Sequence, residues 1–147
     1  AGARVGFCLG NPQLVGMMKR LKSNLDYGMF LPVQRAAIAA ISGDQSGVAL
    51  TRRAYEERRD LLCDGLTAIG WDVPRCASTM FVWAKVPPKF SSSQQFVEEL
   101  LDKAGVLVTP GNAFGPSGEG YVRLALVRTG EEIRGAIDAI RASGVLA

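Results

Sequence analysis

The sequence predicts an α/β domain, in which helices and strands alternate along the chain and pack in layers. Strand-like runs and amphipathic helical segments alternate through its second half. One strand-like run, "MFVWAKVP" at 80–87, is apolar on both faces apart from Lys85, as expected when helices cover a sheet. The length of 147 residues fits about one domain, although the first thirty residues look like the tail of something larger.

The first half of the chain predicts one short buried strand, at residues 4–9, and then three helices. The first helix begins with Asn11 as its N-cap and Pro12 at the first helical position. Gly43 is placed to end the second helix, and the charge run at 52–60 predicts a solvated face on the third. The expected helices are 11–24, 32–43 and 47–69.

The second half of the chain predicts several strands and two helices. Serine caps open the helix that Gly105 ends, and a capping box from Thr129 to Glu132 opens the last helix. The expected strands are 71–75, 80–87, 106–110 and 121–127, and the two helices begin near residues 91 and 129.

Composition and charge exclude several classes of function. Apolar residues make up 48% of the chain and charged residues 21%, which is ordinary for a soluble globular protein. The net charge of +3 is mild and no basic block carries interleaved aromatic residues, so we expect no nucleic-acid binding. No apolar run is long enough to span a membrane and the N-terminus lacks a signal-peptide pattern, so we expect a cytoplasmic protein that does not bind membranes.

The chain contains three cysteines and no histidine. Cys8, Cys63 and Cys76 are widely spaced, which argues against a disulfide framework and a thiolate zinc site, so each is expected to be a small buried residue. Without histidine the chain cannot form a Ser-His-Asp or Cys-His nucleophile pair or a histidine-ligated metal site. Its chemistry must therefore depend on lysine, arginine, carboxylates or a cofactor, and we expect no metal.

A glycine-rich loop and the arginine that follows it form the first candidate site. The loop "TPGNAFGPSGEG", 109–120, is neither a P-loop nor a dinucleotide-binding fingerprint, and its glycines are expected to let backbone pass close to a pocket or a neighbouring chain. In the next strand, Arg123 shares one face with Tyr121 and Ala125. It is either an edge-strand residue that reaches solvent or a side chain that grips a carboxylate through two parallel hydrogen bonds. Arg4, ahead of the first strand-like run, poses the same question.

Five motifs stand in order along nearly the whole chain: "AGARVGFCLGNP", "LKSNLDYGMFLPVQRAAIAA", "YEERRDLL", "STMFVWAKVP" and "VLVTPGNAFGPSGEGYVRLALV". With the closing helix, they resemble the carboxy-terminal portion of a pyridoxal-phosphate-dependent aminotransferase of class I/II, fold type I. The details are most similar to the LL-diaminopimelate or aspartate aminotransferase-like group. The resemblance implies that residues 1–30 end a large cofactor-binding domain. It implies that residues 31–147 form a long interdomain helix and a small α/β domain.

The resemblance also implies roles for three residues. The arginine of the family's G-x-R segment, here Arg4, binds the phosphate of pyridoxal 5'-phosphate, and the arginine of its late Y-x-R strand, here Arg123, grips the α-carboxylate of the substrate. Tyr27 lies in a segment that approaches a partner subunit, so it either shapes the substrate pocket of a homodimer or simply packs in the interface. The implied activity moves an amino group between an amino acid and a 2-oxo acid, in amino-acid metabolism and biosynthesis.

The chain departs from the family pattern at the Schiff-base lysine, which the family places shortly before the G-x-R arginine. Counting back from Arg4 runs past the first residue, so we expect no catalytic residue in this chain and no transamination by the chain alone. Two alternatives remain open. One is other fold type I chemistry, such as a C–S lyase or a decarboxylase. The other is a non-catalytic interaction or regulatory module with an aminotransferase-like fold.

Overall fold

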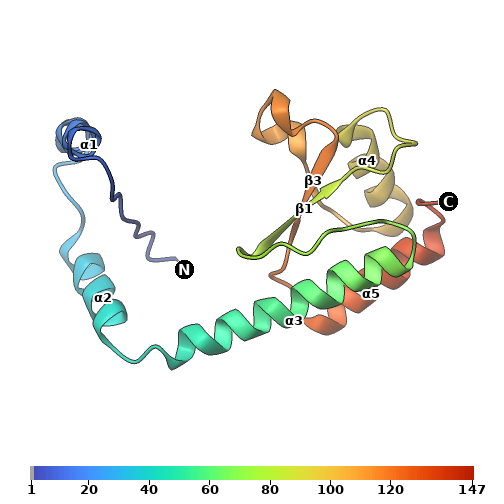
Figure 1. Ribbon diagram of the computed structural model, residues 1–147, viewed down its shortest axis with the longest axis horizontal. Coiled ribbons are helices and arrows are strands. Elements are labelled where there is room, and N and C mark those ends of the chain that lie inside the picture. The colour runs from blue at the N-terminus through green and yellow to red at the C-terminus, as the bar shows by residue number, and fades with distance from the viewer. Residues whose placement is uncertain (1) are drawn as a thin grey trace. The chain divides into compact units, whose positions relative to one another are not determined.

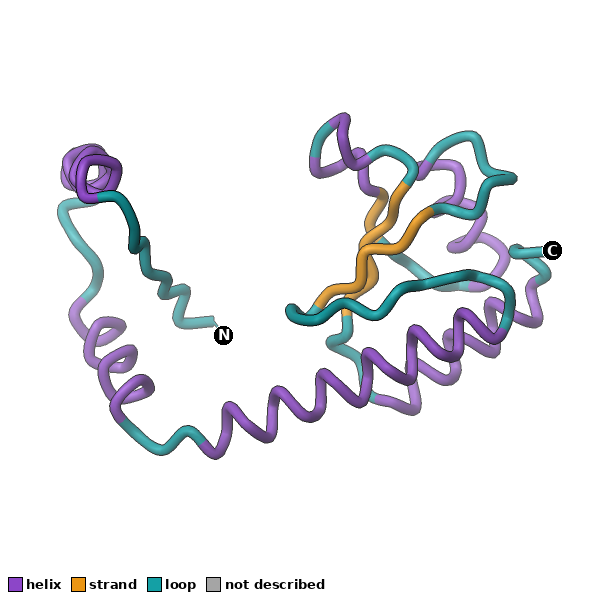
Figure 2. Tube along the Cα trace, in the orientation of Figure 1, coloured by secondary structure: helices purple, strands orange, loops and turns teal. Residues whose placement is uncertain are grey.

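The computed structural model describes residues 2–147 of the chain. These residues form five α-helices, three β-strands and two short 3-10 helices, labelled η (Figure 1, Figure 2). The elements are α1 Pro12–Leu25, α2 Leu31–Ser42, α3 Ser46–Ala68, β1 Phe81–Lys85, α4 Ser93–Ala104, β2 Thr109–Pro110, η1 Gly111–Phe114, η2 Pro116–Gly118, β3 Tyr121–Ala125 and α5 Gly130–Ser143. The chain divides into two compact units, Ala1–Ala49 and Leu50–Ala147.

The first unit contains α1 and α2, whose ends follow from local capping. Asn11 caps α1, because its Oδ1 accepts a hydrogen bond from the backbone N–H of Gln13 at 2.8 Å. Gly43 follows α2 and donates its N–H to the carbonyl of Ala39 at 2.9 Å. Both helices confirm the ones predicted from the sequence.

Residues 4–9 form no regular secondary structure, so the strand predicted there is wrong. A strand needs a neighbour to exchange backbone hydrogen bonds with, and these residues make no backbone–backbone bond within residues 2–147. Cys8 is exposed in this segment, with its Sγ 3.3 Å from Sδ of Met18. The expectation of a buried cysteine is therefore wrong at this position.

The second unit contains a three-stranded antiparallel sheet in the order β1–β3–β2. The central strand is β3, in which Arg123 is paired with Trp83 of β1 on one side and with Thr109 of β2 on the other. The α/β fold class is confirmed, since helices and strands alternate and pack in layers (Figure 1).

The strand predicted at 71–75 does not form, although its apolar residues are buried. Trp71 and Val73 belong to the core, yet their polar atoms bond to other elements. The indole Nε1 of Trp71 donates to the carbonyl of Lys85 at 2.8 Å, and the N–H of Val73 donates to Oγ1 of Thr67 at 3.3 Å. Burial without a strand partner explains why an apolar run gave a wrong prediction here.

One face of the sheet packs against α3, α4 and α5. The buried side chains are Val82, Ala84, Val122 and Leu124 from the strands, Leu62 and Leu66 from α3, Phe96 and Leu100 from α4, and Ile133, Ile137 and Ile140 from α5. Each large side chain of this kind contributes about 1.5–3 kcal/mol by burial. The helices α3 and α5 run side by side in Figure 1 and meet at Gly65, where a Cβ would lie 2.5 Å from Cδ1 of Ile137.

The opposite face of the sheet carries the alternate strand residues. Trp83 stacks on Tyr121 with the ring centres 5.8 Å apart, and it meets Phe114 of η1 edge-on at 5.7 Å. Trp83 is 40% exposed, Tyr121 36% and Phe114 52%, so no α-helix of the second unit covers these three rings. An aromatic surface of this kind surrounds Arg123, which lies on the same face.

Candidate functional site

Arg123 lies on the central strand of the sheet, not on an edge strand. Its neighbours on β3, Val122 and Leu124, point into the core, whereas Arg123 itself points to the aromatic face and is half-buried. The face predicted for Arg123 from strand alternation is therefore confirmed. The edge-strand alternative is excluded by the strand order.

The guanidinium group of Arg123 lies between two phenyl rings. Its Cζ is 4.3 Å from the centre of the Phe81 ring and 4.6 Å from the centre of the Phe114 ring. A cation over an aromatic face is attracted by about 0.5–1 kcal/mol at exposed sites, and by more where water is removed. Two rings also restrict the rotation of the guanidinium plane.

The Nε–H of Arg123 is buried and has no hydrogen-bond partner in the described chain. An unpaired buried donor costs about 1–3 kcal/mol, more where the group is charged, and such groups are rare in folded proteins. An anion with two oxygens would satisfy it, since a guanidinium offers a carboxylate two parallel N–H donors. Within the described chain, Arg123 therefore keeps a buried donor that an oxygen acceptor such as a carboxylate could satisfy.

The glycine-rich loop places Phe114 over Arg123 through a close contact between two glycines. A Cβ on Gly111 would lie 1.9 Å from the carbonyl oxygen of Gly118, and one on Gly118 would lie 2.1 Å from the oxygen of Gly111. Neither position can accept a side chain unless the backbone moves. The glycines predicted to allow close backbone approach do so within the loop itself.

Phe81 is held by the loop that leads into β1. Thr79 accepts a hydrogen bond from the N–H of Phe81 through Oγ1 at 3.0 Å, and the Sγ of Cys76 donates to its carbonyl at 3.2 Å. Thr79 adopts a φ of 76°, a conformation that β-branched residues rarely adopt. The strain at Thr79 and the two bonds to Phe81 show that this loop is tightly determined.

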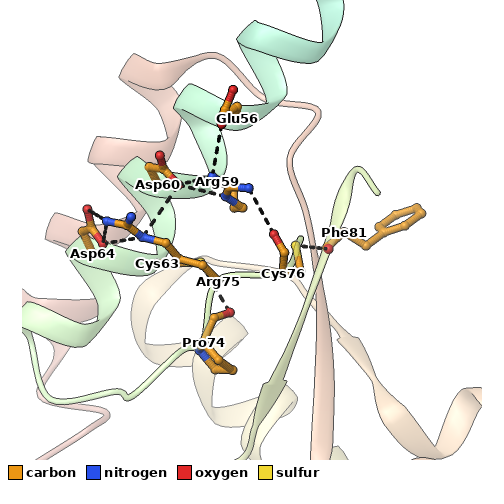
Figure 3. A network of polar contacts seen from close by, with 9 residues as sticks. All are labelled: Glu56, Arg59, Asp60, Cys63, Asp64, Pro74, Arg75, Cys76 and Phe81. Carbon is orange, nitrogen blue, oxygen red and sulfur yellow. Dashed lines mark hydrogen bonds and ion pairs between the residues drawn. The ribbon is translucent and has the colours of Figure 1, made fainter. Parts of the chain in front are cut away.

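A polar network on α3 supports the same loop (Figure 3). Arg59 donates from Nη1 to the carbonyl of Cys76 at 3.1 Å, and Asp60 accepts from Nε of the same arginine at 2.8 Å. A hollow of about 780 Å³ opens beside this contact, lined by α3 residues from Arg52 to Arg59 and by the loop from Cys76 to Phe81. Phe81 belongs both to the lining of this hollow and to the surroundings of Arg123, on which its ring packs.

The two rings beside Arg123 and the support from Arg59 were not predicted from the sequence. Phe81 and Phe114 are separated from Arg123 by forty-two and nine positions, and only the strand pairing and the glycine loop bring them together. The position of Phe81 could have been predicted from the sequence, since strand alternation places it on the same face of β1 as Trp83. Arg59 carried none, because it stands in a charge run typical of a solvated helix face.

Arg4 and Tyr27 belong to the first unit, and both are exposed. Arg4 makes no hydrogen bond or ion pair within residues 2–147, and its backbone has a φ of 55°. A free guanidinium has the donors that a phosphate requires, so the residue fits the phosphate of the expected cofactor. The Tyr27 side chain is fully exposed, with its ring and hydroxyl accessible.

Burial raises the pKa of the Cys63 thiol to about 11. The thiol is enclosed in the core beside Pro74, so it confirms the expected buried cysteine and is unsuited to act as a nucleophile. Within residues 2–147, no group of three or more histidine, cysteine, aspartate or glutamate residues could hold a metal ion. None of the described helices combines the length and apolarity needed to cross a membrane.

Comparison with known proteins gives one family. The family model described as "Aminotransferase class I and II" matches residues 1–140. The chain is 44% identical over 140 residues to an LL-diaminopimelate aminotransferase of Moorella thermoacetica, a match that covers 95% of this chain and 36% of that protein. It is 45% identical over 144 residues to the glutamate-pyruvate aminotransferase AlaC of Escherichia coli, covering 97% of this chain and 35% of that protein.

A solved structure of similar fold is a Thermus thermophilus aspartate aminotransferase mutant complexed with tryptophan. The TM-score is 0.85 at 29% identity, and the match covers 97% of this chain and 37% of that one. The chain thus spans about a third of the length of the relatives it matches, since the covered shares are 36% and 35%.

Proposed function

The chain belongs to the class I and II aminotransferases, and we propose that it is the carboxy-terminal portion of an enzyme that moves an amino group between an amino acid and a 2-oxo acid with pyridoxal phosphate. The names of two relatives support the transamination reaction. Those relatives act on different substrates by name, so the shared substrate feature is the carboxylate of amino acids and 2-oxo acids.

The proposed role of Arg123 is to bind that carboxylate, and its buried unpaired Nε–H is the observation that carries the proposal. A carboxylate that accepts from the guanidinium would remove the cost of the unpaired donor. Phe81 and Phe114 would hold the guanidinium plane and keep water from competing for it. A lysine at this position could supply the charge but not the planar pair of donors.

Orientation is the contribution that Arg123 would make to the chemistry. The cofactor, when bound, supplies an electron-poor ring that stabilises negative charge at the substrate Cα. Fixing the carboxylate determines which bond at Cα faces that ring, and so which bond breaks. Arg4 would bind the phosphate of the cofactor, which fits its free and exposed guanidinium.

The remaining parts of the proposal concern assembly. Residues 1–30 would end the large cofactor-binding domain, and residues 31–147 would form the interdomain helix and the small domain. The whole enzyme would be a cytoplasmic homodimer in which the exposed Tyr27 shapes the pocket of the partner subunit. We expect no transamination by this chain alone, since it spans only about a third of the length of its relatives.

The carboxylate role can be tested directly on the chain. Pyruvate is titrated into ¹⁵N-labelled chain while the Nε–H resonance of Arg123 is followed by NMR, with chloride as the control anion. The resonance should move with pyruvate and much less with chloride, and Arg123→Lys, which lacks this N–H, should bind pyruvate more weakly when binding is measured by calorimetry. A wild-type resonance that pyruvate leaves unchanged would exclude carboxylate binding by Arg123 in this chain.

A further inference from the structure

We propose that Arg59 is a positioning residue for the carboxylate site, acting on Arg123 through the carbonyl of Cys76 and the ring of Phe81. Arg59 lies on α3 and makes no contact with Arg123 itself. It is joined to Arg123 by three successive contacts between named groups. The proposal rests on the carboxylate role of Arg123 for its functional consequence, although its structural part can be tested without that role.

The first contact is a hydrogen bond from an arginine that is itself fixed. Asp60 accepts from both Nε and Nη2 of Arg59, at 2.8 and 2.7 Å, which leaves Nη1 directed at the carbonyl of Cys76 at 3.1 Å. The Arg59 side chain is only 19% exposed, so little water competes for these bonds. A guanidinium whose plane is held by a carboxylate loses little freedom on making a further bond.

The second contact runs within the loop from Cys76 to Phe81. The Sγ of Cys76 donates to the Phe81 carbonyl at 3.2 Å, and Oγ1 of Thr79 accepts from the Phe81 N–H at 3.0 Å. Both polar groups of the Phe81 backbone are thus bonded to side chains of this loop. Because Thr79 holds a strained φ of 76°, the turn needs support from outside to keep this shape, and Arg59 provides it at Cys76.

The third contact is the face of the Phe81 ring against the guanidinium of Arg123, with 4.3 Å between the ring centre and Cζ. Phe81 is partly buried at the first position of β1, where the strand leaves the loop. A shift of the loop would therefore displace this ring. Figure 3 shows Arg59, Cys76 and Phe81 in this order from α3 to the strand.

The neighbouring arginine on α3 supports the other side of the site. Arg58 donates from Nη1 to the carbonyl of Leu126 at 3.2 Å, just past the end of β3, which carries Arg123. Arg59 and Arg58, adjacent on α3, thus bond to the loop before β1 and to the residue after β3. Helix α3 is placed to hold the two strands that contribute Phe81 and Arg123 to the site.

The test compares three variants of the full 147-residue chain. Arg59→Ala removes the bond to Cys76, and Arg59→Lys keeps a cation and one donor. Arg53→Ala removes an exposed arginine of the same helix, which pairs with Glu57. The Nε–H resonance of Arg123 is measured first without ligand, since two ring faces shift it from the position of a solvated arginine. Pyruvate is then added, and thermal unfolding of each variant is followed separately.

The expected results differ among the variants. Arg59→Ala moves the Arg123 resonance toward the position of a solvated arginine and weakens pyruvate binding roughly two- to tenfold, the factor that the loss of one hydrogen bond commonly produces. In Arg59→Lys, the Arg123 resonance and the affinity for pyruvate lie between those of Arg59→Ala and the wild type. In Arg53→Ala, the resonance and the affinity stay as in the wild type. If Arg59→Ala does not fold, the lysine variant alone must show an intermediate resonance.

Two outcomes overturn the proposal, and one separates it from the carboxylate role. An Arg123 resonance that stays in place in both Arg59 variants, while the melting temperature falls, would show that Arg59 only stabilises the fold. An equal displacement in Arg53→Ala would show that any loss of charge on α3 has the same effect. If the resonance moves in Arg59→Ala but no chain binds pyruvate, the positioning stands and the carboxylate role fails.

Discussion

The guanidinium carbon of Arg123 lies 4.3 Å from the centre of the Phe81 ring, although the two residues come from different strands. Phe81 is paired in the sheet with Ala125, two residues beyond Arg123, so the ring reaches its neighbour diagonally across the aromatic face. A cation is thus held between two rings with one buried donor unpaired in the described chain, an arrangement that costs stability.

Arg123→Leu should therefore remove carboxylate binding without destabilising the fold. The substitution removes an unpaired buried donor, which favours folding by about 1–3 kcal/mol, and loses two cation–π contacts of about 0.5–1 kcal/mol each. We expect the free energy of unfolding to fall by no more than about 1 kcal/mol and to rise by no more than about 2 kcal/mol, measured by urea denaturation. A loss of more than about 2 kcal/mol would show that the arginine stabilises the fold and is not a site residue held at a cost to stability.

Gly111→Ala should displace the loop that carries Phe114. The added Cβ would lie 1.9 Å from the carbonyl oxygen of Gly118, and backbone cannot move aside cheaply. We expect a loss of at least about 2 kcal/mol in the free energy of unfolding, together with a shift of the Arg123 Nε–H resonance. Gly135→Ala is the matched control, because nothing lies within 4 Å of a Cβ at that exposed helical position. It should stabilise the chain by about 0.5–1 kcal/mol.

The carboxylate of Glu119 should make stability depend on pH in the acid range. The backbone N–H groups of Ser93 and Gly120 donate to it at 2.6 and 2.9 Å, and these bonds hold its pKa below the ordinary 4.5. A lowered folded pKa stabilises the fold above the unfolded value, and the effect is lost as pH falls through the folded value.

Glu119→Gln should then melt below the wild type at neutral pH, with the difference shrinking as the pH is lowered from 4.5. The melting temperatures of both chains across this range check the prediction. Glu98→Gln, on the exposed side of the helix that Ser93 begins, provides the control. A melting difference that stays constant down to the acid limit would contradict the role of the ionised carboxylate.

Cys63 should resist alkylation in the native chain. A pKa of about 11 leaves about one thiol in a thousand ionised at pH 8, and the side chain is enclosed in the core. Iodoacetamide followed by peptide mass spectrometry should show Cys8, which is exposed, labelled first, and Cys63 labelled only after unfolding in urea. Equal labelling rates for Cys8 and Cys63 in native buffer would show that this part of the core opens readily.

The helices and their ends were predictable from the sequence because their causes are local. Asn11 caps α1, Gly105 ends α4 in a left-handed conformation, and Thr129 and Glu132 form the capping box of α5. Strand alternation also placed Arg123 opposite the core. The strands predicted for the apolar runs at 4–9 and 71–75 do not form. An apolar pattern indicates that a segment is buried or lies against a partner, but it does not show whether the segment pairs with another strand.

The tertiary structure alone decided what surrounds Arg123. The alternation of apolar and polar residues is the same in an edge strand and in a central strand. Only the strand order β1–β3–β2 could therefore exclude that Arg123 lies on a solvent-exposed edge strand. The rings of Phe81 and Phe114 meet it through long-range pairing and through a contact between two glycines. The sequence determined which residue is charged and which face it takes, whereas long-range packing determined that its Nε–H is buried without an acceptor.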